Sequence, residues 1–171
     1  MKQNVYMGIP KLSNFAERGF VVAIVEYRPS MVATFPAQVQ DAKTAIRFMR
    51  KNAEKYNIDP NNIFIWGDSS GGHTAVFVGL SSGNKDFDTE VYSVYSDKVN
   101  AVIDFYGPTD IAKMKDFPSI FDHDKPTSPE GMLIGKLTVS ENPEKAQKAN
   151  PLNYIKTENT IPPILIAHGD M

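Results

Sequence analysis

The chain has 171 residues, 42% of them hydrophobic, which is enough for one globular domain with a buried core but too few for two comfortable ones. Its 18 basic and 20 acidic residues leave a formal net charge of −2, so the composition favours a small or neutral ligand over nucleic acid or an anionic membrane. The lack of cysteine excludes disulfides, a thiolate zinc site and a cysteine nucleophile. No apolar run approaches the length of a membrane span and no signal peptide is apparent, so we expect a soluble chain.

The first part of the chain alternates between helix-like and strand-like segments. A short helix is predicted at 10–20, where apolar residues share one face and Gly19 suits a left-handed C-terminal cap. The run FVVAIVEY, residues 20–27, is apolar and β-branched with little alternation, as expected of a strand buried on both faces. Residues 38–55 predict a long amphipathic helix, because apolar side chains recur every three or four positions. Its apolar stripe comprises Val39, Ala42, Ile46, Met49 and Ala53.

Strands and helices continue to alternate in the middle of the chain. The run IFIWG, residues 63–67, predicts a buried strand, and residues 73–83 predict a helix that ends at its terminal glycine. Residues 97–107 and 161–169 supply two further strands. Such alternation is typical of a parallel sheet covered by crossover helices, so we predict an α/β fold with a mostly parallel sheet.

The alternation breaks at 108–160, which is rich in proline, charged and polar residues. One helix is predicted there, NPEKAQKA, with Asn142 as its cap and Pro143 in the first helical position. We interpret this stretch as a small cap insertion over the loop edge of the sheet, within a single domain that covers residues 1–171.

The strand at 63–67 runs directly into a serine between glycines. Gly67, Ser69 and Gly71 fit the pattern G-x-S-x-G, in which a strand ends at a sharp, strained turn and a helix begins at once. Such a nucleophile elbow holds the serine hydroxyl clear of the sheet, and we predict Ser69 as a catalytic nucleophile. Side chains in place of the two glycines are expected to collide with the neighbouring strand and helix. The backbone N–H of Ser70 is expected to face the oxyanion that forms during acyl transfer.

Two other interpretations of GDSSGG remain open. The letters resemble the GDSGG around the nucleophile of trypsin-like proteases, but those are cysteine-bearing β-barrels without a helix after the serine. Alternatively, the stretch is a glycine- and serine-rich turn without chemistry, or one that binds phosphate at a helix N-terminus. A phosphate loop of the G-x-x-x-x-G-K-[ST] type needs a lysine that this stretch lacks.

Nearly the whole chain resembles the α/β-hydrolase fold, and more narrowly the bacterial esterase and lipase group that includes the bifunctional acetyl-xylan and feruloyl esterases of the BD-FAE type. The resemblance rests on WGDSSGGH, on FAERGFVVAIVEYRPS, on the segment from FPAQVQ to NIDPNNI, and on PPILIAHGD. The sequences DHDKPTSPEGMLIG and ENPEKAQKANPLNYI are the most discriminating, because other α/β-hydrolases vary there.

The resemblance also implies where the partners of the serine stand. In the family the triad acid lies three positions after the glycine of the HG pair, and the histidine follows later. Here that glycine is Gly169, followed by Asp170 and Met171, so both partners are expected beyond Met171. The HGGG-like loop that completes the oxyanion hole is expected upstream of residue 1. We therefore expect a truncated esterase core, incomplete at both ends, with little activity of its own.

Residues inside the chain are weaker candidates for the missing roles. The histidines considered are His73, His123 and His168, and the acids considered are Asp104, Asp110 and Asp170. His73 is expected to pack behind the elbow, and His123 to be a solvated loop residue or to line the substrate cleft. Asp170 stands one position short of the expected place of the acid. Asp41 and Arg28 are interpreted as structural or solvated.

The resemblance implies a serine carboxylic ester hydrolase that acts through an acyl-serine on small-molecule or carbohydrate esters, such as acetyl or feruloyl groups on plant polysaccharide. It requires no metal or other cofactor, and neither nucleic acid nor a membrane is an expected partner. The alternatives are a serine peptidase of the prolyl-oligopeptidase type and a non-catalytic remnant or binding protein. Exposed sheet edges predict self-association. We expect a cytoplasmic protein by default, with secretion left open because the N-terminus resembles a truncated one.

Overall fold

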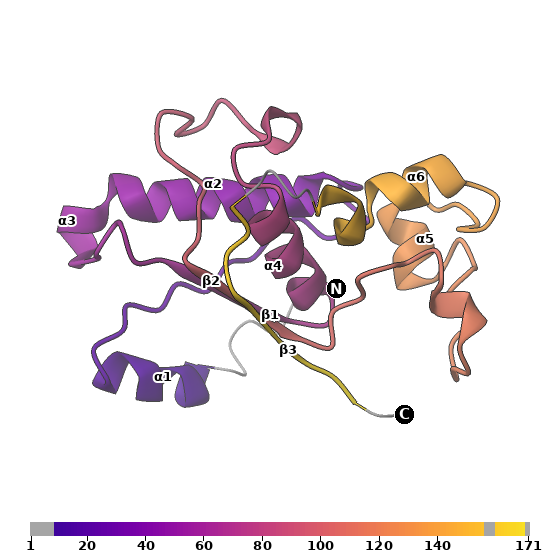
Figure 1. Cartoon of the computed structure of the whole chain (residues 1–171), viewed down its shortest axis with the longest axis horizontal. Helices are drawn as coiled ribbons and strands as arrows, with labels where there is room; N and C mark the ends of the chain where they lie inside the picture. Colours follow the sequence, from indigo (N-terminus) through magenta and orange to yellow (C-terminus); the bar gives the residue numbers. More distant parts are fainter. Residues whose placement is uncertain (1–8, 156–159, 170–171) are drawn as a thin grey trace.

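A parallel three-stranded sheet forms the centre of the molecule (Figure 1). The computed structural model describes residues 9–155 and 160–169. The sheet has the order β1–β2–β3, and its strands are Phe64–Asp68, Ala101–Phe105 and Ile164–Ala167. In the register of the ladder, Trp66 lies opposite Ile103, and Ile103 lies opposite Leu165. The predicted α/β fold with a mostly parallel sheet is confirmed.

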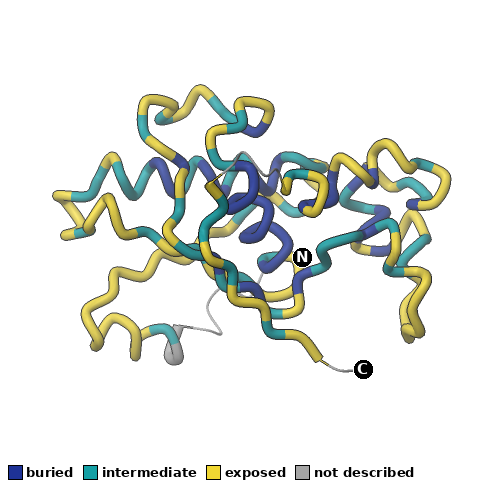
Figure 2. Tube along the Cα trace, in the orientation of Figure 1, coloured by how far each residue is buried: buried dark blue, intermediate teal, exposed yellow. Residues whose placement is uncertain are grey.

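Helix α4 (Ser70–Leu80) lies on one face of the sheet, where it packs against β1, β2 and helix α2 (Ala37–Lys51). Figure 2 shows that burial is concentrated along α4. Every residue from Gly72 to Leu80 is buried, as expected of a helix that is apolar all round. Its Phe77 belongs to the same core cluster as Val39, Ala42 and Ile46, so the stripe predicted for α2 does face inward.

The long helix predicted at 38–55 is interrupted at Asn52, so this prediction was wrong at its C-terminal end. Helix α2 stops one residue earlier, and a short helix α3 (Ala53–Tyr56) follows. The Asn52 side chain donates a hydrogen bond to the carbonyl oxygen of Phe48 at 2.8 Å. Asparagine side chains compete in this way with the helical hydrogen bonds of the backbone, which gives a local reason for the break.

Helix α1 (Ile9–Glu17) reaches the other face of the sheet through Phe15. It ends as predicted, with Gly19 in the left-handed region at a φ of 88°. The ring of Phe15 meets the ring of Trp66, with their centroids 5.5 Å apart. Because side chains alternate across a strand, Trp66 points away from the face that carries α4. Trp66 is still 46% exposed, so α1 covers this face only in part.

The strand predicted at 20–27 does not form, and this prediction was wrong. The segment is extended in Figure 1 but pairs with no strand in the described part of the chain. Its large apolar side chains are exposed, namely Phe20, Val21, Val22, Ile24 and Val25. An apolar, β-branched run favours extended backbone, but a ladder also needs a neighbouring strand, which local sequence does not supply.

The chain between β2 and β3 builds a second, smaller core. It contains the 3-10 helices η3 (Met114–Asp116) and η4 (Pro151–Tyr154) and the helices α5 (Pro129–Leu133) and α6 (Pro143–Lys148). The buried residues of this core are Ile111, Ile134, Val139, Ala146 and Ala149. Phe35 packs against both this core and the main one, which joins the two. The interpretation of 108–160 as a cap insertion stays a prediction.

Helix α6 begins at Pro143 with Asn142 as its N-cap residue, as predicted, but the Asn142 side chain makes no capping hydrogen bond. The Asn142 amide donates instead to the carbonyl oxygen of Thr138 at 2.9 Å. Helix α5 was not predicted, because five residues are too few to show a helical period. Another short 3-10 helix, η2 (Lys85–Phe87), lies between α4 and β2. Among residues 9–155 and 160–169, no helix is long and apolar enough to cross a bilayer.

Candidate active site

Ser69 occupies the single residue between the end of β1 and the start of α4. Its φ of 50° and ψ of −119° lie in a region that non-glycine residues rarely adopt. Its N–H donates to the carbonyl oxygen of Phe105 on β2, and its own carbonyl accepts from the N–H of His73. The residue is exposed, and within the described residues no hydrogen bond reaches its hydroxyl. The backbone is therefore fixed in a strained turn, while the Oγ atom stays free.

The glycines around Ser69 are not equally constrained. A Cβ atom on Gly67 would lie 2.1 Å from the carbonyl carbon of Gly71, so only glycine fits on the strand side. A Cβ on Gly71 would meet only Asp68 Oδ1, at an ordinary 3.9 Å, so the collision predicted for Gly71 was wrong. The tight position is Gly72, whose Cβ would lie 2.1 Å from Asp104 Oδ1. Because α4 begins at once, its second glycine presses against β2.

Ser70 is the first residue of α4, so its N–H precedes the helical hydrogen-bond ladder and stays available to a ligand at the helix N-terminus. Its side chain is engaged elsewhere, since Ser70 Oγ lies 2.8 Å from the hydroxyl of Tyr27. The motif did not predict a role for Tyr27, because that residue lies 43 positions away in the sequence. This contact ties the segment after α1 to the elbow.

The described histidines do not supply a base to Ser69. His73 is buried, and its Nε2 atom donates to the carbonyl oxygen of Ala149 at 2.8 Å. Burial lowers the pKa of His73, although the hydrogen bond to Ala149 acts in the opposite direction. His123 bonds to Glu130 and Ser119, and His168 Nδ1 lies 3.2 Å from the carbonyl oxygen of Gly169. His73 therefore packs behind the elbow, as expected.

The acids considered from the sequence have other partners. Asp104 is fully buried on β2 and accepts the N–H of Gly107 at 2.8 Å. Burial raises the pKa of Asp104, although the Gly107 N–H and the nearby His168 and His73 act to lower it. Asp110 accepts a hydrogen bond from the Asn150 amide at 2.6 Å, and Asp170 lies outside the described residues.

The structural interpretation of Arg28 and Asp41 agrees with the geometry. The Nε and Nη2 atoms of Arg28 both bond to the Asp41 carboxylate, at 2.9 Å and 2.8 Å. The Arg28 backbone N–H donates to the same carboxylate. The hydrogen bonds to Asp41 raise the pKa of Arg28, although partial burial opposes them. This pair fixes the start of α2 against the extended segment that precedes it.

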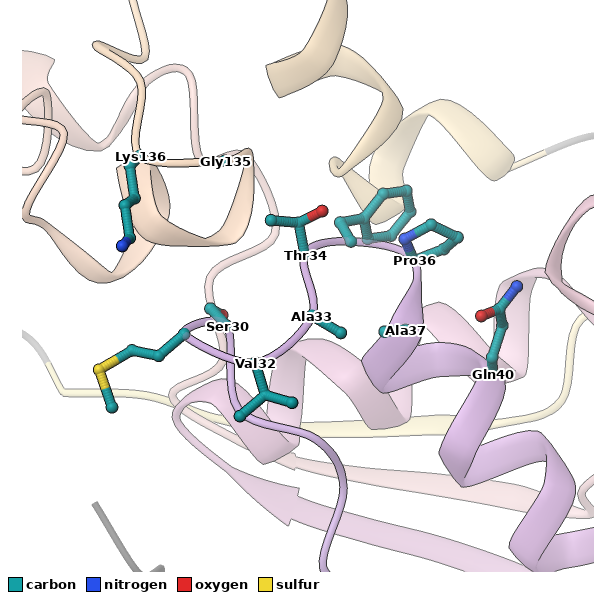
Figure 3. A pocket seen from close by; sticks show the side chains of 11 residues that line it. Ser30, Val32, Ala33, Thr34, Pro36, Ala37, Gln40, Gly135 and Lys136 are labelled. Carbon is teal, nitrogen blue, oxygen red and sulfur yellow. The ribbon is translucent and has the colours of Figure 1, made fainter.

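An open hollow of about 500 Å³ lies beside this segment (Figure 3). Residues 30–37 and Gln40 form one side, and Gly135 and Lys136 form the other. Ser69 is not among its lining residues. The hollow is therefore a surface feature separate from the exposed Ser69.

Comparison with known proteins identifies the family. A protein-family model described as BD-FAE matches residues 1–171, the whole chain. The chain belongs to the BD-FAE family. This BD-FAE chain is 28% identical over 170 residues to Esterase LipC of Mycobacterium tuberculosis, an alignment that covers 95% of the chain but 39% of LipC. The resemblance inferred from the motifs is confirmed.

Solved structures agree with this membership of the BD-FAE family. One, described as a truncated form of carbohydrate esterase from gut microbiota, is 40% identical with a TM-score of 0.77, and the match covers 85% of this chain and 53% of that one. Another, described as a bifunctional GH43-CE from Bacteroides eggerthii, is 35% identical with a TM-score of 0.82, and the match covers 92% of this chain and 21% of that one. The BD-FAE chain thus spans about half or less of the length of each protein.

Proposed function

We propose that this chain carries the nucleophile of a serine carboxylic ester hydrolase and that Ser69 is that nucleophile. The observation that carries the proposal is the backbone of Ser69, held at a φ of 50° between a parallel strand and a buried helix while its hydroxyl is exposed. Strain of this kind persists only where the surrounding structure enforces it, and it is concentrated at functional sites. The names of the matched relatives, which are esterases, support the same reaction class.

In the proposed reaction, Ser69 Oγ attacks the ester carbonyl carbon, and the Ser70 N–H stabilises the oxygen that becomes negative. A histidine takes the serine proton and passes it to the departing alcohol as the C–O bond breaks. Water then hydrolyses the acyl-serine. Because no described histidine is directed at Ser69, the base and its acid partner are proposed to come from outside the described residues.

The proposed substrates are acetyl or feruloyl esters on plant polysaccharide. One support is the pair of sequences between β2 and β3, DHDKPTSPEGMLIG and ENPEKAQKANPLNYI, which distinguish this family from other α/β-hydrolases. The other is the match to two structures described as a carbohydrate esterase and a bifunctional GH43-CE. A serine peptidase is the alternative that shares the elbow. Hydrolysis of acetyl esters without cleavage of a proline amide would favour the esterase, and the reverse result would favour the peptidase.

Labelling with a fluorophosphonate tests the nucleophile. The probe is applied to the protein encoded by the whole reading frame around this sequence, and the peptide that carries residue 69 is examined by mass spectrometry. We expect Ser69 to be labelled, and Ser69→Ala to reduce the turnover of p-nitrophenyl acetate by roughly 10⁴–10⁶-fold. Ser93→Ala, which alters an exposed serine between η2 and β2, should leave turnover unchanged. An unlabelled Ser69 in that protein would favour the non-catalytic alternative.

A further inference from the structure

Away from the elbow, a serine, a histidine and a carboxylate are joined by hydrogen bonds. Ser119 and His123 lie between β2 and α5, and Glu130 lies in α5. Ser119 Oγ lies 3.1 Å from His123 Nε2, and His123 Nδ1 lies 3.0 Å from Glu130 Oε2. These are the contacts that a nucleophile, a general base and an orienting acid make in a catalytic triad. We propose that Ser119 is a second acyl-accepting serine, with His123 as its base and Glu130 as the positioning residue.

The base and the carboxylate are held firmly, while the serine is open to solvent. The side chains of His123 and Glu130 are 15% and 6% exposed, whereas Ser119 is exposed. Ser128 fixes the loop between them, because its hydroxyl donates to the His123 carbonyl at 2.9 Å and accepts from the Gly131 N–H at 2.9 Å. The imidazole therefore has a fixed orientation, and its Nε2 atom faces an accessible hydroxyl.

The chemistry of the acceptor atoms decides which atoms of these three side chains carry the protons. An ionised Glu130 carboxylate only accepts, so His123 carries its proton on Nδ1 and donates it there. In the neutral imidazole, the Nε2 atom is then the acceptor and takes the hydroxyl proton of Ser119. The N–H of Phe121 donates to Ser119 Oγ at 3.2 Å, which stabilises negative charge as it develops on that oxygen. The arrangement thus favours removal of the proton from Ser119.

The proposed ligands are activated carboxylic esters with an aryl or short acyl group. Ser119 Oγ forms a bond to the ester carbonyl carbon, its proton passes to His123 Nε2, and the proton then goes to the alcohol that leaves as the C–O bond breaks. Phe117, Ile120 and Phe121 are 69%, 93% and 68% exposed, and they offer apolar surface to such a group. Because the Phe121 N–H is directed at Ser119 Oγ and not at the ester carbonyl oxygen, we expect a stable acyl-serine and slow turnover.

Acetylation of Ser119 by p-nitrophenyl acetate tests this proposal in the 171-residue chain that carries Ser69→Ala, so the result does not depend on Ser69. The extent of acetylation at each serine is followed by peptide mass spectrometry. Ser140 is the matched internal control, because it is exposed and its hydroxyl bonds to Asp124 and not to a histidine. We expect Ser119 to be acetylated about 10²-fold faster than Ser140. Equal rates at the two serines in the folded protein would overturn the proposal.

Two variants test the assigned roles. Glu130→Gln should slow the acetylation of Ser119 and leave that of Ser140 unchanged. His123→Ala should slow the acetylation of Ser119 by a similar factor. Added imidazole should restore the acetylation of Ser119, because a free base can enter the vacated space. Recovery at Ser119 with no matching rise at Ser140 would not occur if His123 only supported the loop. Circular dichroism is used to check that each variant is folded. Unchanged acetylation of Ser119 in folded His123→Ala would overturn the role of the histidine.

Discussion

Two neighbouring glycines at the start of α4 meet different surroundings. A Cβ on Gly72 would lie 2.1 Å from Asp104 Oδ1 and 3.1 Å from Gly107 Cα, and Asp104 is fully buried and cannot easily move away. We therefore expect Gly72→Ala to lower the free energy of unfolding by about 1–3 kcal/mol, as overpacking does in cores. Gly71→Ala is the matched control, and it should leave stability unchanged or raise it by up to about 1 kcal/mol. Urea unfolding measures both, and equal losses would contradict the contact analysis.

These residues also show how far the site was predictable. The spacing of Gly67, Ser69 and Gly71 placed the serine in a strand-to-helix turn, because the motif combines a local backbone requirement with the elements on either side. The true steric partner of Gly72 is Asp104, which lies 32 positions further along the chain, so no local pattern indicates it. No local pattern indicates the Ala149 carbonyl that His73 binds or the Tyr27 hydroxyl that Ser70 binds, because these partners are also distant in the sequence.

At the scale of elements, buried charges fix helix α2 to the loop between α4 and β2. The Nζ atom of Lys43 lies 2.8 Å from Asp97 Oδ2 and also donates to the Ser81 carbonyl, and both charged side chains are almost fully buried. Burial acts to raise the pKa of Asp97, but the Lys43 ammonium, the Gly83 N–H and Arg47 outweigh it, so the pKa is lowered from 3.8. A lowered pKa means that this contribution to stability is complete above pH 3.8 and is lost as the pH falls further.

Replacement of Asp97 by asparagine tests this linkage. At neutral pH, Asp97→Asn should lower the free energy of unfolding by about 3–5 kcal/mol, because the buried ammonium loses its counter-charge. The deficit should shrink as the pH falls below 3.8, where wild-type Asp97 also becomes protonated. Asp122→Asn, which breaks an exposed pair with Lys125, is the control and should change stability by less than about 1 kcal/mol. A deficit that stays constant with pH would contradict the assignment.

Elements were predicted well where a single helix or strand carries its own pattern. The apolar stripe of α2 was found from its spacing, and the strand β1 from its apolar run. The burial expected for β1 was wrong, because Phe64 and Trp66 are exposed and the other residues of the strand are not fully buried. The failure at 20–27 has a different origin, because a strand exists only when another strand supplies the ladder. Helix α5 is fixed by the small core that it helps to build, and its five residues were too few to predict it.

At the scale of the whole molecule, the sheet has two open edges. In the described part of the chain, β1 and β3 each pair with one strand only. The carbonyl groups of Pro163 and Ala167 accept hydrogen bonds from Val102 on β2 and from Tyr106 directly after it. By the alternation of a parallel ladder, the N–H and C=O groups of Ile166 therefore face outward. Unpaired backbone of this kind pairs readily with another chain, and exposed Leu165 and Ile166 side chains add apolar surface beside it.

We therefore expect the 171-residue chain to self-associate as its concentration rises, with the edge of β3 in the contact. Ile166→Lys should shift the population toward monomer, because a charge on an edge strand opposes pairing and the side chain is 58% exposed, so the fold tolerates it. Val94→Lys is the matched control, since it adds the same charge at an 89% exposed position between α4 and β2. Sedimentation velocity over a concentration series measures the distribution. If Val94→Lys dissociates the complex as fully as Ile166→Lys, net charge and not the β3 edge controls the association. If the unmodified chain is a monomer at every concentration, the open edges do not pair.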